Sequence, residues 1–154
     1  MADTSLIENK IGLLIWKASN YWQSKLRKIV KDYNLTLNEY LILEAIFKLM
    51  QNQKGLSQIE ISIFSGIDIS VASVTFKLLE NKKLITRRTK KDNRKKIVEM
   101  LASGMNLYNK VKPLILRAEL NIFYKLHNEI YNFKNLIIMK FYTNLLFKIL
   151  IDPS

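Results

Sequence analysis

The chain has 154 residues and a formal net charge of +12, and 49% of its residues are hydrophobic, which is ample for the core of one domain. It contains no cysteine and one histidine, His127, so the sequence excludes disulfides, thiol redox chemistry and a metal site built from those ligands, and we expect no cofactor. The most apolar run, residues 136–151, is interrupted by polar residues and is shorter than the ~20 residues of a membrane span. The N-terminal residues show no signal-peptide pattern, so we expect the chain to be cytoplasmic and to have no membrane partner.

Helical periodicity begins near the N-terminus. A capping-box pattern at residues 5–8 precedes apolar residues that recur every three or four positions as far as Tyr33, which predicts one long helix ending at Asn34. A second capping box, at residues 36–39, predicts the start of a second helix. Its apolar stripe fades in the polar loop of residues 51–55, so the second helix should end there.

Two short helices are predicted next. A third capping box, at residues 57–60, opens the first of them, with Ile61 and Phe64 turned inward. A glycine then stops that helix, and Ser70 is expected to cap the next one, over residues 70–81. Two sharply bounded short helices in succession indicate a helix–turn–helix. The inward face of the second one is expected to consist of Ala72, Phe76 and Leu79.

After the second short helix the apolar period changes toward two. Residues 84–89 and 96–100 predict two short strands rich in β-branched residues, joined by a turn over residues 90–95. A long helix is predicted over residues 101–128, and a last helix, apolar on nearly every side, over residues 133–150. The long helix is expected to turn inward the face made of Leu107, Val111, Leu114, Ala118, Ile122 and Leu126.

This order predicts a mainly α fold with a small β-hairpin wing, that is, a winged helix–turn–helix flanked by long N- and C-terminal dimerisation helices. The predicted parts are an N-terminal dimerisation helix (1–34), a winged DNA-binding domain (35–100) and C-terminal dimerisation helices (101–154). One small domain cannot cover every face of the last helix, and at ~25 cal/mol per Å² the uncovered apolar area would forgo several kcal/mol. We therefore expect a stable homodimer whose chains share these helices.

The densest charge lies in residues 82–96, where nine Lys and Arg residues stand against one acid, Asp92. Such a cluster repels itself unless an anion neutralises it, and the phosphates of duplex DNA do so while releasing counterions. The cluster directly follows the predicted recognition helix, residues 70–81. Double-stranded DNA is therefore the expected partner, with that helix in the major groove and a wing, residues 87–96, in the minor groove.

The candidate DNA contacts fall on these two elements. The outward residues of the recognition helix offer serine hydroxyls, valine methyls that suit thymine, and one lysine, but the first turns hold no Arg, Asn or Gln, which predicts reading by shape and apolar contact. In the wing, Arg94 suits a narrow, A·T-rich minor groove, and Asp92 can hold its position. The full candidate set is Ser70, Val71, Ser73, Val74, Lys77, Arg87, Arg88, Lys90, Lys91, Asp92, Arg94, Lys95 and Lys96.

Short segments that share an order and spacing with a known family are LTLNEYLIL (35–43), GLSQIEI (55–61), LENKKLITR (79–87), DNR (92–94) and VEM (98–100) with Gly104. Together they resemble the MarR family of bacterial transcription regulators, and helices of suitable length flank them on both sides. The resemblance implies a homodimer with interleaved terminal helices and one winged domain for each half-site of the DNA. It also implies that Asp92 and Arg94 belong to the wing.

Two positions depart from the family pattern. Lys83 stands where a glycine is usual after the recognition helix, which strains a turn, and Leu101 stands where a threonine cap is usual, which weakens a helix start by about 1 kcal/mol. Many family members release DNA when they bind a small aromatic acid, so the resemblance implies a possible aromatic effector. Residues that could line its pocket, and that equally fit a core at their helical spacing, are Trp16, Tyr21, Trp22 and Tyr40.

The sequence leaves two functions open. The first is a sequence-specific regulator, acting as a homodimeric repressor on a pseudo-palindromic, A·T-rich operator in the nucleoid. The second is a nonspecific DNA-architectural or RNA-binding protein that uses the same charge. An enzyme is not expected, because the chain has no glycine-rich phosphate loop and no Ser/His/Asp set with a histidine to spare.

Overall fold

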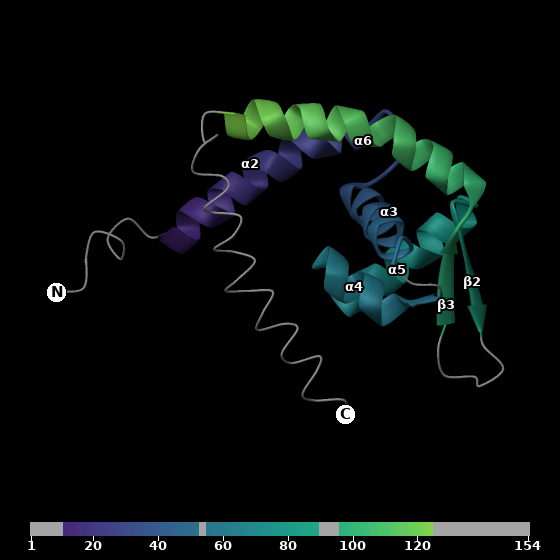
Figure 1. The fold of residues 1–154 in the computed structure, drawn as a ribbon. Coiled ribbons are helices and arrows are strands. Elements are labelled where there is room, and N and C mark those ends of the chain that lie inside the picture. The colour runs from purple at the N-terminus through teal and green to yellow at the C-terminus, as the bar shows by residue number, and fades with distance from the viewer. Residues whose placement is uncertain (1–10, 53–54, 90–95, 125–154) are drawn as a thin grey trace. The chain divides into compact units, whose positions relative to one another are not determined.

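The computed structural model describes residues 11–52, 55–89 and 96–124 (Figure 1). The chain divides into a compact unit of residues 1–116 and a second unit of residues 117–154. The mainly helical fold with a β-hairpin is confirmed, whereas the predicted last helix lies outside the described residues. The elements are α2 (Ile11–Lys31), α3 (Leu37–Leu49), β1 (Leu56–Ser57), α4 (Gln58–Ser65), α5 (Ile69–Asn81), β2 (Ile85–Thr89), β3 (Lys96–Met100) and α6 (Ala102–Phe123).

Both capping boxes that fall within the described chain form as the sequence predicts. At the start of α3, Glu39 donates its backbone N–H to Thr36 Oγ1 at 3.2 Å, and the backbone N–H of Thr36 donates to Glu39 Oε2 at 2.7 Å. Ser57 and Glu60 repeat this exchange at the start of α4, at 3.2 and 2.7 Å. Each box satisfies backbone donors that a helix start leaves free, so it fixes where the helix begins. The box predicted at residues 5–8 lies outside the described residues.

Helices α4 and α5 form the predicted helix–turn–helix. Gly66 ends α4 in the left-handed conformation, at φ 71°, which glycine adopts without a clash of a Cβ atom. The two helices are bent by 112° from each other, and bends of about 90–120° are typical of this motif. In the described part of the chain no single helix is long and apolar enough to cross a membrane; only α4 and α5 taken together meet that test, by length and composition.

Helix α3 lies at the centre of the core. It packs against α2, α4, α5 and β3, and its side chains Tyr40, Leu43 and Ile46 are buried. The prediction for the inward face of α5 is confirmed, and this face determines which residues of α5 point outward. The buried apolar residues of α5 are Ala72, Phe76 and Leu79.

Two details of the short helices differ from the sequence prediction. Phe64 is exposed, and Ser62 is buried instead, where its hydroxyl donates to the carbonyl of Ile67 at 2.5 Å. This hydrogen bond lets a small polar residue close the turn after α4, which a pattern of apolar residues cannot reveal. Ser70 does not cap α5: Asp68 is the cap, because its carboxylate accepts the backbone N–H of Ser70 at 2.8 Å.

The prediction for the inward face of the long helix α6 holds only in part: Val111 is buried as predicted and Leu107 is half-buried, but the buried face is rotated from the predicted one. Leu114, on the predicted face, is 37% exposed. Both faces recur at helical spacing, so the period alone could not choose between them. The choice is made at Gly104, where an added Cβ would lie 2.2 Å from the carbonyl oxygen of Leu84, so the backbones touch there. The buried residues of α6 are Gly104, Tyr108, Val111 and Ile115.

The strands form one sheet of three, in the order β1–β3–β2. Strands β2 and β3 are the predicted hairpin, and their antiparallel register places Ile85 opposite Met100. Strand β1 is not predicted, because two residues are too few to display a period of two. It pairs Leu56 with Val98 and so attaches the start of the helix–turn–helix to the hairpin.

Candidate nucleic-acid interface

Helix α5 presents the predicted outward face. Val71 is 43% exposed and Val74 is 61% exposed, and the serines and lysine on this face are exposed as well. Because Ala72, Phe76 and Leu79 are held in the core, the outward face cannot rotate away. The structure therefore brings together on one surface Ser70, Val71, Ser73, Val74 and Lys77.

The start of α5 is closed by its own cap. Asp68 accepts the backbone N–H of Ser70 at 2.8 Å, and the Ser70 hydroxyl also donates to Oδ1 of Asp68. Hydrogen bonds from Ser70 hold the pKa of Asp68 below its usual value, because they stabilise the carboxylate. The Ser70 hydroxyl is thus already engaged, and a negative charge stands at the end of the helix that would enter DNA.

Arg87 and Arg88 lie on opposite faces of β2, as neighbouring residues of a strand must. The side chain of Arg87 is 15% exposed and bound to Glu80, whereas that of Arg88 is 72% exposed. Arg88 Nε lies 3.6 Å from Glu99 Oε2, a loose pair at the surface. The two arginines, predicted alike as phosphate contacts, therefore differ in how free their charges are.

The pair of Glu80 and Arg87 fastens helix α5 to strand β2. Arg87 Nε donates to Glu80 Oε2 at 2.9 Å, and the backbone N–H of Arg87 donates to Glu80 Oε1 at 3.2 Å. One carboxylate near the end of α5 thus holds both the side chain and the backbone of β2. Several charge-assisted hydrogen bonds to one group fix orientation as well as distance.

We expect the carboxyl of Glu80 to titrate below its usual pKa of 4.5, because it accepts hydrogen bonds from Arg87. A lowered folded-state pKa means that the pair adds stability above pH 4.5, and that this stability is lost as the pH falls through the folded-state pKa. Glu80 is 36% exposed, so the loss should be only about 0.5 kcal/mol. Carbon-13 NMR of this carboxyl should give a midpoint that rises in Arg87→Met, and an unmoved midpoint would contradict the pairing.

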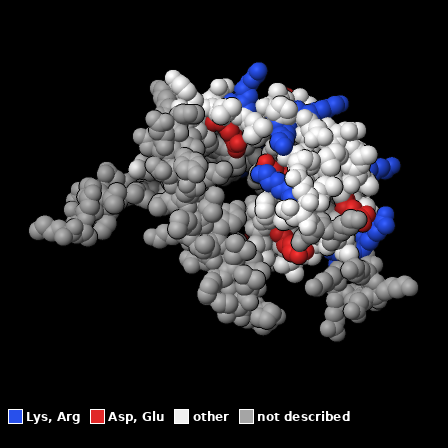
Figure 2. All heavy atoms as spheres, viewed as in Figure 1, with Lys and Arg blue, Asp and Glu red and all other residues white. Residues whose placement is uncertain are grey.

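The surface around the wing strands is mixed in charge where the structure describes it. Basic and acidic side chains stand next to one another there (Figure 2), in agreement with the pair of Arg88 and Glu99. Lys96, the first residue of β3, is exposed. The other predicted wing contacts lie outside the described residues: Lys90, Lys91, Asp92, Arg94 and Lys95.

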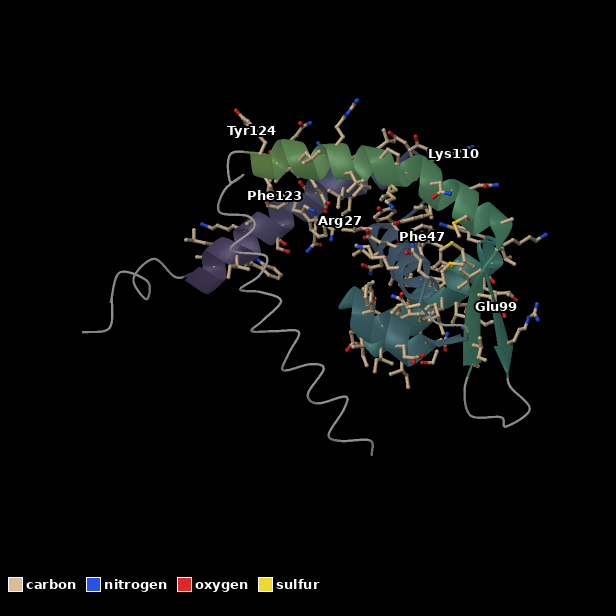
Figure 3. The ribbon with its side chains drawn as sticks, viewed as in Figure 1. Arg27, Phe47, Glu99, Lys110, Phe123 and Tyr124 are labelled. Atoms are coloured by element: carbon tan, nitrogen blue, oxygen red, sulfur yellow. The ribbon has the colours of Figure 1, made fainter. Side chains whose placement is uncertain are left out.

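An aromatic cluster joins α3 to α6. The rings of Tyr40 and Tyr108 stack with centroids 5.9 Å apart. Phe47, which is labelled in Figure 3, tilts against Tyr108 at 4.7 Å between ring centroids. Burial raises the pKa of Tyr108 to about 12, and the charge of Glu44 adds to the rise. Lys112 covers the Phe47 ring from 5.0 Å. The cluster therefore holds the two helices together mainly through apolar contact.

The four predicted effector residues have unlike surroundings. Tyr40 is a core residue, whereas Trp16 and Tyr21 are each more than half exposed on α2 and Trp22 is half-buried. Aromatic residues at helical spacing serve both as core and as surface here. An effector role for these residues stays a prediction.

Sequence reasoning missed the acids that organise this surface. Asp68 caps the recognition helix, and Glu80 fixes the wing to it. Glu39 does more than close its capping box, since it also pairs with Lys82 at the end of α5. The available signals were an aspartate two residues before Ser70 and an acid seven residues before an arginine, and neither spacing by itself says that the two side chains will meet.

Comparison with known sequences agrees with this geometry. The family model for the transcriptional regulator SarA/Rot matches residues 24–111. A curated relative, the uncharacterized HTH-type transcriptional regulator YdcH of Bacillus subtilis (strain 168), is 24% identical over 105 residues, which cover 68% of this chain and 71% of that protein.

Two solved structures share the fold. A MarR-family transcriptional regulator from Rhodococcus sp. RHA1 matches with a TM-score of 0.74 and 19% identity, over 87% of this chain and 94% of that one. The S. aureus MepR–DNA complex matches with a TM-score of 0.73 and 20% identity, over 90% of this chain and 98% of that one. The predicted resemblance to the MarR fold is confirmed.

Proposed function

This chain belongs to the SarA/Rot family of transcriptional regulators, and on that premise we propose that it represses transcription as a homodimer bound to a pseudo-palindromic, A·T-rich operator. In each half-site α5 enters the major groove, and the wing, residues 87–96, enters the adjacent minor groove. The protein acts in the cytoplasm, on the nucleoid. Repression follows because an occupied operator blocks access to the promoter.

One observation carries this proposal: helix α5, whose outward face is exposed, is hydrogen-bonded directly to strand β2 of the wing. The hydrogen bonds from Arg87 to Glu80 supply the link, at 2.9 and 3.2 Å. A surface that must fit two grooves at once gains affinity when its parts are positioned before binding. Arg88, Lys77 and Lys96, which are exposed, then suit phosphates, and Arg87 suits the role of holding the wing.

The homodimer is supported by the apolar surface of α2. Four consecutive residues of this helix are each at least 45% exposed, whereas monomers rarely leave so much apolar surface together. A homodimer formed through this surface would carry two recognition helices, which helix–turn–helix dimers present about one turn of DNA apart, roughly 34 Å. These α2 residues are Leu13, Leu14, Ile15 and Trp16.

Selection of binding sites from random duplex DNA tests the proposal. We expect a near-palindrome with half-sites about 10 bp apart, bound at least about tenfold more tightly than random DNA. Arg94→Ala should weaken binding to it by about tenfold, the effect of losing roughly 1.4 kcal/mol. Lys110→Ala is the matched control, because it also removes one exposed positive charge but does so on α6. Figure 3 shows Lys110 on this helix, away from the wing strand β3 that carries Glu99.

The competing function is nonspecific binding to DNA or RNA. It predicts equal affinity for selected and random duplexes, with a salt dependence of about −0.9 in the logarithm per phosphate contacted. It also predicts that Arg94→Ala and Lys110→Ala weaken binding equally, because only total charge would matter. If the selection returned no motif, nonspecific binding as an architectural protein would become the better-supported function.

A further inference from the structure

The recognition helix has an unusual chemistry for reading base pairs. The side chains that form two hydrogen bonds to a purine are Arg, Asn and Gln, and none of these precedes Asn81 on α5. Lys77 lies eight residues after the start of α5, which is about 12 Å along the helix and places it near phosphates rather than bases. The base-facing start of α5 must therefore use other groups.

The hydroxyl groups near the start of α5 offer little hydrogen bonding to bases. The Ser70 hydroxyl donates to Asp68, so it is committed to the cap of its own helix. Thr75 is buried, and its hydroxyl donates to the carbonyl of Val71 at 2.9 Å. The remaining hydroxyl in the first two turns of α5 is that of Ser73, which is exposed. One hydroxyl, which donates or accepts with any base, cannot distinguish the base pairs.

What the first two turns do present is a pair of valines. Val71 and Val74 are three residues apart, so their side chains are neighbours on one face of the helix. They are 43% and 61% exposed, so a substantial part of their apolar surface faces water in the free protein. In the major groove the one apolar group on any base edge is the C5-methyl of thymine.

We infer that Val71 and Val74 form a reading pair that recognises the C5-methyl groups of thymine in each half-site. The inference rests on the proposed function and adds how that function selects its sequence. Thymine is favoured because its methyl removes valine surface from water, and cytosine is disfavoured because its exposed N4 amino group would lose water against the same valines. Selection by this pair depends on a methyl group and not on a hydrogen bond.

The test replaces thymine by deoxyuridine, which has the same pairing edge and lacks only that methyl. The selected duplex and its all-deoxyuridine copy are compared by fluorescence anisotropy with the full chain, at one salt concentration. Each lost methyl contact should weaken binding about fourfold, since a buried methyl is worth about 0.8 kcal/mol. Two contacts in each of the two half-sites are four contacts, so their full loss predicts a ratio of about 250-fold. A ratio below fivefold, little more than one contact, overturns the inference.

A variant shows whether the valines are the cause. In Val71→Ala with Val74→Ala the thymine-to-deoxyuridine ratio should fall to less than half of its original value, because the methyl partners are gone. Both sites are exposed and alanine favours helix, so folding should be preserved, which circular dichroism can check. Leu78→Ala is the matched control: Leu78 is 43% exposed on the same helix, two turns after Val71 and one turn after Val74, farther from the base-facing start of α5, so the ratio should not change.

The outcomes separate the inference from the proposed function. If no duplex is preferred over random DNA, the proposed function fails. If a selected duplex is preferred but its deoxyuridine copy binds equally well, only the thymine-methyl reading fails. A ratio that persists in the double-alanine variant also overturns the reading, because the methyl would then act through the shape of the DNA.

Discussion

Gly104→Ala is expected to destabilise the folded protein by about 3 kcal/mol or more, the upper range for overpacking a core. An added Cβ would lie 2.2 Å from the carbonyl oxygen of Leu84 and 3.1 Å from its carbonyl carbon. Backbone atoms cannot rotate away as the end of a long side chain can. The same carbonyl oxygen accepts the backbone N–H of Leu101 at 3.0 Å, so moving it would break a hydrogen bond at the start of α6.

The measurement is thermal or chemical unfolding at one protein concentration, because association would make the midpoint depend on concentration. For a chain of this size the loss corresponds to a midpoint lower by about 6–12 °C. Gly12→Ala is the matched control: Gly12 is a residue of α2, and an added Cβ there meets nothing within 4 Å beyond its chain neighbours and its own helix backbone, so alanine should stabilise by about 0.5–1 kcal/mol. Equal effects of the two variants would refute the close contact of α6 with Leu84.

Lys82→Met should destabilise the protein by about 2 kcal/mol, because it leaves the buried charge of Glu39 without its partner. Lys82 Nζ lies 2.8 Å from Oε1 and 2.9 Å from Oε2 of Glu39, and it also donates to the carbonyl of Asn34 at 2.7 Å. Breaking a fully buried pair costs about 3–5 kcal/mol. The value here is lower because the Lys82 side chain is 30% exposed, so water can reach the site.

A double variant isolates the pair. Glu39→Gln together with Lys82→Met removes both charges and keeps the cap acceptor, so it should be more stable than Lys82→Met alone by about 1 kcal/mol. Lys48→Met is the control, since Lys48 pairs with Glu44 at 3.1 Å on an exposed helix face and should cost only about 0.3–0.5 kcal/mol. If Lys82→Met lowered the free energy of unfolding no more than Lys48→Met does, Lys82 would not be needed to stabilise the buried charge of Glu39.

Much of the fold could be predicted because its signals are local. Two capping boxes and the glycine that ends α4 set helix boundaries within a few residues, and the helical period set the inward face of α5. The outward candidates on α5 follow from that face. Lys83, predicted to strain its turn, does adopt a positive φ, of 56°.

Less of the interface could be predicted. Alternation along β2 implies that Arg87 and Arg88 face opposite ways, but it does not say which one turns toward the protein. The answer depends on Glu80, which the end of α5 brings beside β2. The rotation of α6 was likewise ambiguous, and the prediction chose a face that includes the exposed Leu114.

The sequence by itself determined the order of the elements, where most of the described helices begin and end, and that a basic hairpin follows the helix–turn–helix. Only the tertiary structure decided which charged side chains form ion pairs, such as Lys82 with Glu39, 43 residues apart in the sequence. The physical reason is distance along the chain. Caps and periods arise from hydrogen bonds and side chains within one or two turns, whereas ion pairs and backbone contacts between elements exist only after packing has brought those elements together.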